Sequence, residues 1–117
     1  MIISFSYYPE GNCYFANANL PVAIKNVSLH VNLAITAMPK MTLRVSYENM
    51  PIQIIQGDFR IDSSVTGKLL AVLSNLNGKT VMLYLTFEPN VSTISLPYLE
   101  IQYVPFSLED IPLVWGR

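Results

Sequence analysis

The sequence predicts a mainly β protein, built as a single-domain antiparallel β-sandwich or a small barrel of about seven or eight strands. Three observations lead to this fold class. From residue 27 to residue 37 apolar side chains occupy every odd position, and this two-residue period puts them on one face of a strand. Residues 41–48 and 80–88 show the same alternation. Pro, Gly and Asn residues separate the alternating stretches at short intervals, as in all-β domains.

The first half of the chain is expected to contain several strands. Residues 2–8 alternate and form the first strand, which a turn at 9–12 ends. A short strand follows at 13–16. Residues 17–21 are expected to form a loop, because Pro21 argues against a central strand there. The stretches 27–37 and 41–48 flank a three-residue break, so we expect them to pair as a β-hairpin with their odd faces on one core.

The second half is expected to contain four more strands. Residues 52–56 and 58–61 form two of them, split at Gly57, which marks a bulge or a bend. Residues 80–88 form a strand that is apolar on both faces and is therefore expected to be covered on both sides. Residues 93–104 form the last strand, with a bulge at Pro97 where the alternation slips.

Residues 62–79 have two interpretations. Asp62-Ser63-Ser64 is a good N-cap cluster, the leucines that follow fit a helical stripe, and Gly78 suits the position just past a helix. This favours one short helix around residues 64–77. The alternative is a β-hairpin, because Asn77-Gly78 is a strong two-residue turn signal. Leu and Ala dominate the stretch and do not alternate, so the helix is favoured.

The whole chain, residues 1–117, is expected to form one β domain, a size that suits one core. Residues 105–117 are rich in large apolar side chains and contain two prolines. We expect this tail to be extended and to pack on the domain or on a neighbouring subunit.

The composition predicts association with other protein subunits, in a homo-oligomer or a hetero-oligomer. The chain is 51% hydrophobic and only 13% charged, whereas globular domains carry about 25% charged residues. A surface with so few charges promotes association. The alternative is a monomer whose surface is covered by Ser, Thr, Asn and Gln.

Other partners find little support in the sequence. The seven basic residues form no run, whereas binding to nucleic acid needs clustered cations, so no nucleic-acid partner is expected. No apolar run approaches the length of a membrane-spanning helix, so no membrane partner is expected. Cys13 is the only cysteine and no basic stretch opens the chain. We therefore expect synthesis in the cytoplasm without a signal peptide, followed by assembly into a particle such as a virion.

No catalytic, metal-binding or cofactor-binding set is evident, and the chain is predicted not to be an enzyme. His30 shares a strand face with Ser28 and Asn32, which is more simply a solvated face than part of a catalytic triad. One Cys and one His make no zinc site. Asp58 and Asp62 flank Arg60 without the density of a calcium loop. No phosphate-binding glycine motif is present.

Aromatic residues are the best candidates for contact with a partner, because Tyr and Trp are enriched in interface cores. The clusters lie near the start of the chain (Tyr7, Tyr8, Tyr14, Phe15) and near its end. The predicted interface residues are Met82, Tyr84, Tyr98, Tyr103, Phe106 and Trp115.

These observations predict a non-catalytic structural or assembly protein. A subunit of a virus or bacteriophage particle would fit, such as a capsid-cement, tail or baseplate component, by analogy at the level of fold. The alternative is a small carbohydrate- or peptide-binding β-sandwich module, which needs an exposed aromatic strip with polar neighbours. An enzyme that uses His30 is the third hypothesis.

Overall fold

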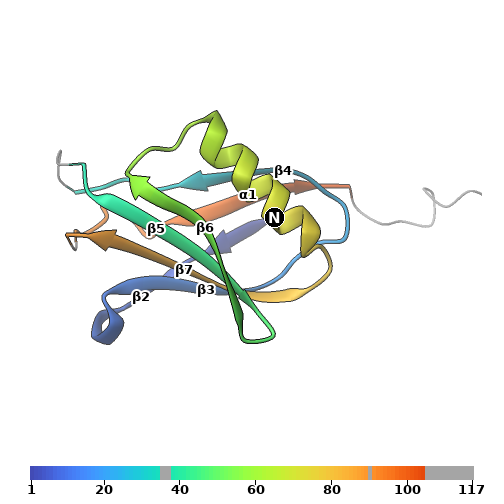
Figure 1. The fold of residues 1–117 in the computed structure, drawn as a ribbon, viewed down its shortest axis with the longest axis horizontal. Helices are drawn as coiled ribbons and strands as arrows, with labels where there is room; N and C mark the ends of the chain where they lie inside the picture. Colours follow the sequence, from blue (N-terminus) through green and yellow to red (C-terminus); the bar gives the residue numbers. More distant parts are fainter. Residues whose placement is uncertain (35–37, 90, 105–117) are drawn as a thin grey trace, which may run out of the picture.

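The structure is a computed structural model that describes residues 1–34, 38–89 and 91–104. In this part of the chain eight strands form two antiparallel sheets, and one helix lies beside them (Figure 1). The inner faces of both sheets contribute side chains to one hydrophobic core. The mainly β fold is therefore confirmed, as a sandwich rather than as a closed barrel.

The larger sheet has five strands in the order β2-β3-β7-β5-β6. Their bounds are β2 (Ser6–Tyr8), β3 (Cys13–Asn19), β7 (Thr80–Glu88), β5 (Lys40–Tyr47) and β6 (Met50–Asp58). The strand β7 lies in the middle and has the bounds that the alternation predicts. Its inward residues Val81, Leu83 and Leu85 are fully buried, because the smaller sheet covers this face.

The smaller sheet has three strands in the order β1-β8-β4. Their bounds are β1 (Ile2–Ser4), β8 (Tyr98–Tyr103) and β4 (Ile24–His30). Val27 and Leu29 of β4 point into the core, as the odd positions predict. The strand expected at 27–37 begins earlier and ends at His30, and residues 35–37 lie outside the described residues.

The expected first strand, residues 2–8, is in fact two strands in different sheets. The chain crosses from β1 to β2 at Phe5, whose side chain is fully buried and whose backbone N–H donates to the Pro97 carbonyl at 2.9 Å. One continuous segment therefore closes one side of the sandwich. Alternation could not reveal the crossing, because Ile3 and Phe5 face the same core on both sides of it.

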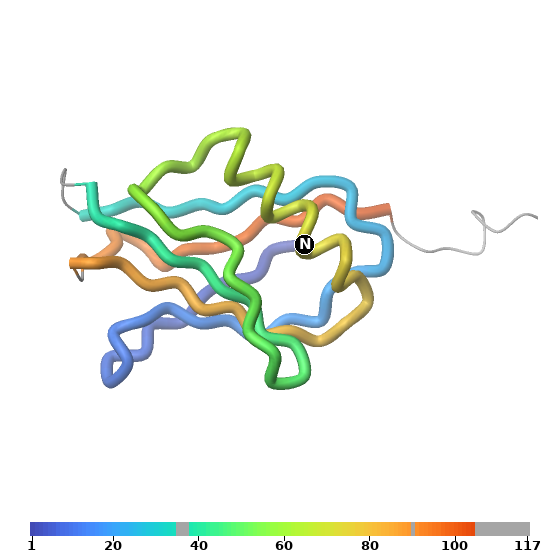
Figure 2. Tube along the Cα trace, viewed as in Figure 1, coloured from blue at the N-terminus to red at the C-terminus, as the bar shows by residue number. Residues whose placement is uncertain are grey.

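The helix interpretation of residues 62–79 is confirmed by α1 (Ser63–Asn75). The Asp62 carboxylate accepts a hydrogen bond from the Val65 backbone N–H at 3.1 Å and caps the helix. Val65, Leu69 and Leu73 form its buried stripe. The helix contacts β4 and β6, the edge strands of the two sheets, and so closes the side of the sandwich opposite the β1–β2 crossing (Figure 2).

The hairpin expected between residues 27–37 and 41–48 is wrong, because β4 and β5 belong to different sheets. The odd faces of both strands still point to one core, so the pattern placed the faces correctly and the pairing incorrectly. The strand β5 pairs instead with β6 through the two-residue turn Glu48–Asn49. Both turn residues have positive φ, 51° and 64°, as a tight hairpin requires.

Three further boundaries differ from expectation. The strand β3 runs on to Asn19 through the expected loop at 17–21, and Pro21 follows it. The strand β6 is continuous, and its bulge is at Ile54 rather than at Gly57, because Leu43 faces Ile55 while Arg44 faces Gln53. The last strand begins only at Tyr98, after the buried Pro97.

Candidate interaction surfaces

An open pocket lies on the outer face of the five-stranded sheet, the face turned away from the core. It has a volume of about 470 Å³. We call it the outer pocket. Gly11 and Cys13 line one side, Tyr84 and Thr86 of β7 with Arg44 and Ser46 of β5 form the floor, and Asn49 and Pro51 line the other side. The 3-10 turn η1 (Pro9–Gly11) and the β5–β6 hairpin turn therefore flank it.

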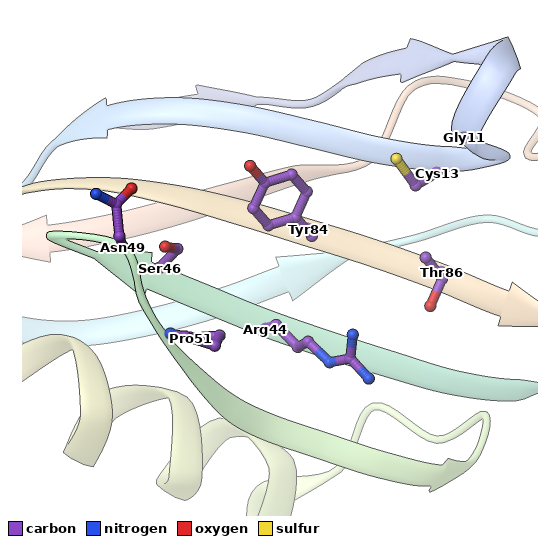
Figure 3. A pocket seen from close by; sticks show the side chains of 8 residues that line it. All are labelled: Gly11, Cys13, Arg44, Ser46, Asn49, Pro51, Tyr84 and Thr86. Atoms are coloured by element: carbon purple, nitrogen blue, oxygen red, sulfur yellow. The ribbon is translucent and has the colours of Figure 1, made fainter.

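Strand register places an aromatic residue beside a cation in this pocket. Tyr84 of β7 lies opposite Arg44 of β5 on one side and opposite Phe15 of β3 on the other. Figure 3 shows the Tyr84 ring between the side chains of Asn49 and Cys13. The Tyr84 hydroxyl donates to the Met82 sulfur at 3.5 Å. The floor thus combines an aromatic ring with hydroxyl groups and one guanidinium group.

Arg44 is the one charged residue among the described residues that line the outer pocket. The other cation of β5, Lys40, lies opposite Glu88 and Asp58 in the strand register. Arg44 instead lies opposite Tyr84 and Gln53, which carry no charge. In the described part of the chain the one ion pair joins Arg60 and Asp62, so the exposed Arg44 guanidinium has no carboxylate partner there.

A second surface lies at one end of the sandwich, where residues 31–34 meet residues 91–97. The Ala34 N–H donates to the Ser92 carbonyl at 2.9 Å, and the Ile94 N–H donates to the Asn32 carbonyl at 2.8 Å. Residues 38–39 join the same end, since the Phe59 N–H donates to the Pro39 carbonyl at 2.8 Å. We call residues 31–34, 38–39 and 91–97 the charge-free end. It is the left end in Figure 2.

Large apolar side chains stand exposed on the charge-free end. Ile94 is 73% exposed, Met38 67% and Leu96 54%. The two stretches of sequence that supply this end, 26–39 and 89–99, contain no Asp, Glu, Lys or Arg. Ile61, 37% exposed, lies beside it and shares a pocket of about 210 Å³ with Ser95 and Asn32.

The predicted interface residues do not form one surface. Met82 and Tyr84 lie on the outer face of β7, in the five-stranded sheet, whereas Tyr98 and Tyr103 lie on β8, in the three-stranded sheet. Met82 is 36% exposed and Tyr103 41%. Phe106 and Trp115, with the whole expected tail 105–117, lie outside the described residues. Whether these residues contact a partner stays a prediction.

His30 lies on the outer face of the three-stranded sheet. Its ring stacks on Tyr98 with the centroids 4.4 Å apart and the planes 8° apart. Ser28 is half-buried and Asn32 is exposed. The histidine thus packs on a tyrosine, and among the described residues its ring donates no hydrogen bond to a carboxylate, which a triad would require.

The acidic candidates are spread over the surface. Arg60 Nε lies 4.0 Å from Asp62 Oδ2, with both side chains well exposed, and Asp62 serves as the helix cap. In residues 1–34, 38–89 and 91–104 no group of three or more His, Cys, Asp or Glu side chains could hold a metal ion. In the same residues the helix is too short to cross a membrane.

Sequence reasoning did not predict that the residues of the outer pocket lie together, or that the residues of the charge-free end do. Arg44 stands on the outer, even-numbered face of the stretch 41–48, but its approach to Tyr84 depends on the pairing of β5 with β7. The stretches 26–39 and 89–99 are readable in the sequence as uncharged, but so is 11–24, so lack of charge alone did not identify the charge-free end. In the early aromatic cluster, the ring centroids of Tyr7 and Tyr14 lie 5.0 Å apart.

Comparisons with known protein families, with curated protein sequences and with solved structures found no match. No relative therefore supplies an expected substrate or partner.

Proposed function

We propose that this protein is a non-catalytic structural subunit that assembles with other protein subunits through its charge-free end. The observation that carries the proposal is the exposure of Ile94, Met38 and Leu96 on loops that contain no charged residue. Exposed apolar side chains that gather on an uncharged surface are typical of protein–protein contacts.

The backbone of this end is held in place, which favours binding. Residues 91–97 are tied to residues 31–34 by backbone hydrogen bonds and to the five-stranded sheet through Tyr14. A surface that is already ordered loses less conformational entropy when a partner binds. Exposed Ile94 and Leu96 are thus presented on a supported loop.

A virus or bacteriophage particle is the assembly that we propose for such a subunit, as a capsid-cement, tail or baseplate component. The support is the combination of a small β-sandwich, few charges and an apolar end. This part of the proposal is an analogy of fold and surface character.

The oligomeric state tests the proposal. Size-exclusion chromatography with light scattering should give a mass above that of one chain, and the double substitution Ile94→Asn, Leu96→Asn should reduce it. Val22→Asn is the matched control, because Val22 is 70% exposed and lies beside Gly78, away from the loop 91–97. A wild-type chain that stays monomeric at high concentration, or a double variant that assembles like the wild type, would contradict the proposal.

A carbohydrate- or peptide-binding module is the second candidate, and the outer pocket favours it. Its volume of about 470 Å³ lies in the range of small-molecule sites, about 300–1,000 Å³. Tyr84 offers a ring for stacking, and Ser46, Thr86 and Asn49 offer polar groups. A glycan array with Tyr84→Ala as the control tests it, and the absence of any glycan signal would contradict sugar binding.

A further inference from the structure

We infer that the outer pocket binds residues 105–117 of a second copy of this chain, so that copies join head to tail. The inference rests on the proposed function as an assembly subunit and names the partner of one of its surfaces.

The outer pocket offers two kinds of contact to a peptide segment. Tyr84, Cys13 and Pro51 provide apolar surface, and Arg44 provides a cation with no carboxylate partner among the described residues. A guanidinium group binds a carboxylate through two parallel hydrogen bonds. The pocket therefore fits a segment that carries apolar side chains together with a carboxylate.

Residues 105–117 have this chemistry. They contain adjacent acids, Glu109 and Asp110, and one cation, Arg117. Their six large apolar side chains lie on both sides of the acids: Phe106, Leu108, Ile111, Leu113, Val114 and Trp115. The charge-free end has no cation among its own residues, and the cations that border it, Lys40 and Arg60, already lie opposite or beside carboxylates. Charge complementarity therefore favours the outer pocket, where Arg44 has no carboxylate partner among the described residues.

The length of the segment also agrees with the span of the outer pocket. The pocket extends over three neighbouring strand pairs, from β3 through β7 and β5 to β6, a span of roughly 14 Å at the usual strand spacing. Six residues from Asp110 to Trp115 reach roughly 20 Å when extended. Pro112 lies within these six and disfavours a helix there. If Glu109 and Asp110 bind Arg44, the residues that follow are long enough for Trp115 to reach the far side of the pocket.

The start of the segment favours binding between copies. Val104, the last described residue, is tied to Ala23 by a hydrogen bond from its N–H at 2.9 Å and follows β8 of the three-stranded sheet. The outer pocket lies on the five-stranded sheet, across the core. A segment that returned to the outer pocket of its own chain would have to round the edge of the sandwich within the four residues 105–108, which reach roughly 14 Å when extended.

A contact between two different surfaces repeats from copy to copy and builds a ring or a filament. The segment would supply one half of each contact and the outer pocket the other half. The charge-free end would remain available for a separate contact.

The test uses the full chain and its single tryptophan. Trp115 is the only Trp, so its emission reports on this segment alone. As the concentration rises, the emission should move to shorter wavelength together with a rise in mass by sedimentation equilibrium. Arg44→Glu should raise the midpoint concentration about tenfold or more, as loss of a central charged contact does. Lys68→Glu, an exposed cation on α1, is the matched control and should change it little.

Mixing two variants tests whether the pocket of one copy binds the segment of another. Arg44→Glu disables the pocket and Trp115→Ala disables the segment, so neither variant alone should form the head-to-tail contact, and any association that remains belongs to the charge-free end. A one-to-one mixture should form heterodimers, since one pocket and one segment remain intact.

Three outcomes would overturn the inference. Assembly that is unchanged in both variants would overturn it while leaving the proposed assembly function standing. A Trp115 emission that does not depend on concentration in a monomer would place the segment on its own chain. A wild-type chain that is monomeric with solvent-exposed Trp115 would overturn both the inference and the proposed function.

Discussion

The Tyr14 hydroxyl of β3 accepts hydrogen bonds from both the backbone N–H of Thr93, at 3.3 Å, and the Thr93 side-chain hydroxyl, at 3.2 Å. Tyr14 is 5% exposed and 79 residues distant from Thr93 in sequence. This contact ties the loop 91–97 to the five-stranded sheet. It therefore supports the exposed positions of Ile94 and Leu96 on the charge-free end.

Replacing Tyr14 with Phe removes this support while keeping the ring. The Thr93 N–H and hydroxyl lose their acceptor, so Tyr14→Phe should lower the free energy of unfolding by about 1–2 kcal/mol. Urea denaturation measures the change. Tyr8→Phe, at an exposed ring bonded to Glu10, is the control and should stay within about 0.5 kcal/mol of wild type. Equal effects of both substitutions would show that the Tyr14 bonds add no stability.

The helix cap gives a second prediction. Asp62→Ala removes the acceptor for the Val65 N–H and should lower the free energy of unfolding by about 1 kcal/mol, whereas Asp62→Asn, which keeps a capping oxygen, should lower it much less. The exposed ion pair with Arg60 adds little, so Arg60→Ala should be close to neutral. Thermal and urea unfolding of the three variants check this order. A larger loss from Arg60→Ala than from Asp62→Ala would contradict it.

The crossing between the sheets gives a third prediction. Phe5 is fully buried where the chain passes from β1 to β2, so Phe5→Ala should destabilise the protein by about 3–5 kcal/mol. Phe15→Ala is the matched control, because Phe15 is half-buried on the outer face of β3 and should cost clearly less. Circular dichroism during urea titration measures both. A similar loss of stability in Phe5→Ala and Phe15→Ala would mean that the Phe5 crossing contributes no more to the core than an outer-face residue does.

The β5–β6 turn gives a fourth prediction. Glu48 has φ of 51°, a left-handed conformation that costs an ordinary residue roughly 1 kcal/mol and glycine almost nothing. Glu48→Gly should therefore raise the thermal midpoint. Ser46→Gly, in the interior of β5, should lower it because glycine weakens a strand. A lower midpoint for Glu48→Gly would contradict the turn geometry.

Local side-chain periodicity predicted much of the fold from sequence alone. The bounds of β7, the inward faces of β4 and β5, and the helix that starts in the cluster Asp62-Ser63-Ser64 all follow from patterns within one stretch of chain. Such patterns report which face of an element is buried. They therefore gave the fold class and most of the core.

Strand pairing could not be predicted in the same way. The β4–β5 hairpin was wrong because two adjacent amphipathic strands can face one core from opposite sheets. The crossing at Phe5 was missed because burial continues through it. The outer pocket depends on the same information, since Arg44 reaches Tyr84 only through the β5–β7 register. The exposure of Ile94 depends on the loop 91–97 leaving the sheet after its bridge to Leu33.

The molar mass of the wild-type chain tests the central claim most directly. Sedimentation equilibrium should be run up to about 1 mM, where even a contact of about −4 kcal/mol is half-formed. The account predicts a mass that rises with concentration to at least twice the 13.1 kDa of one chain. A constant 13.1 kDa over the whole range would contradict it.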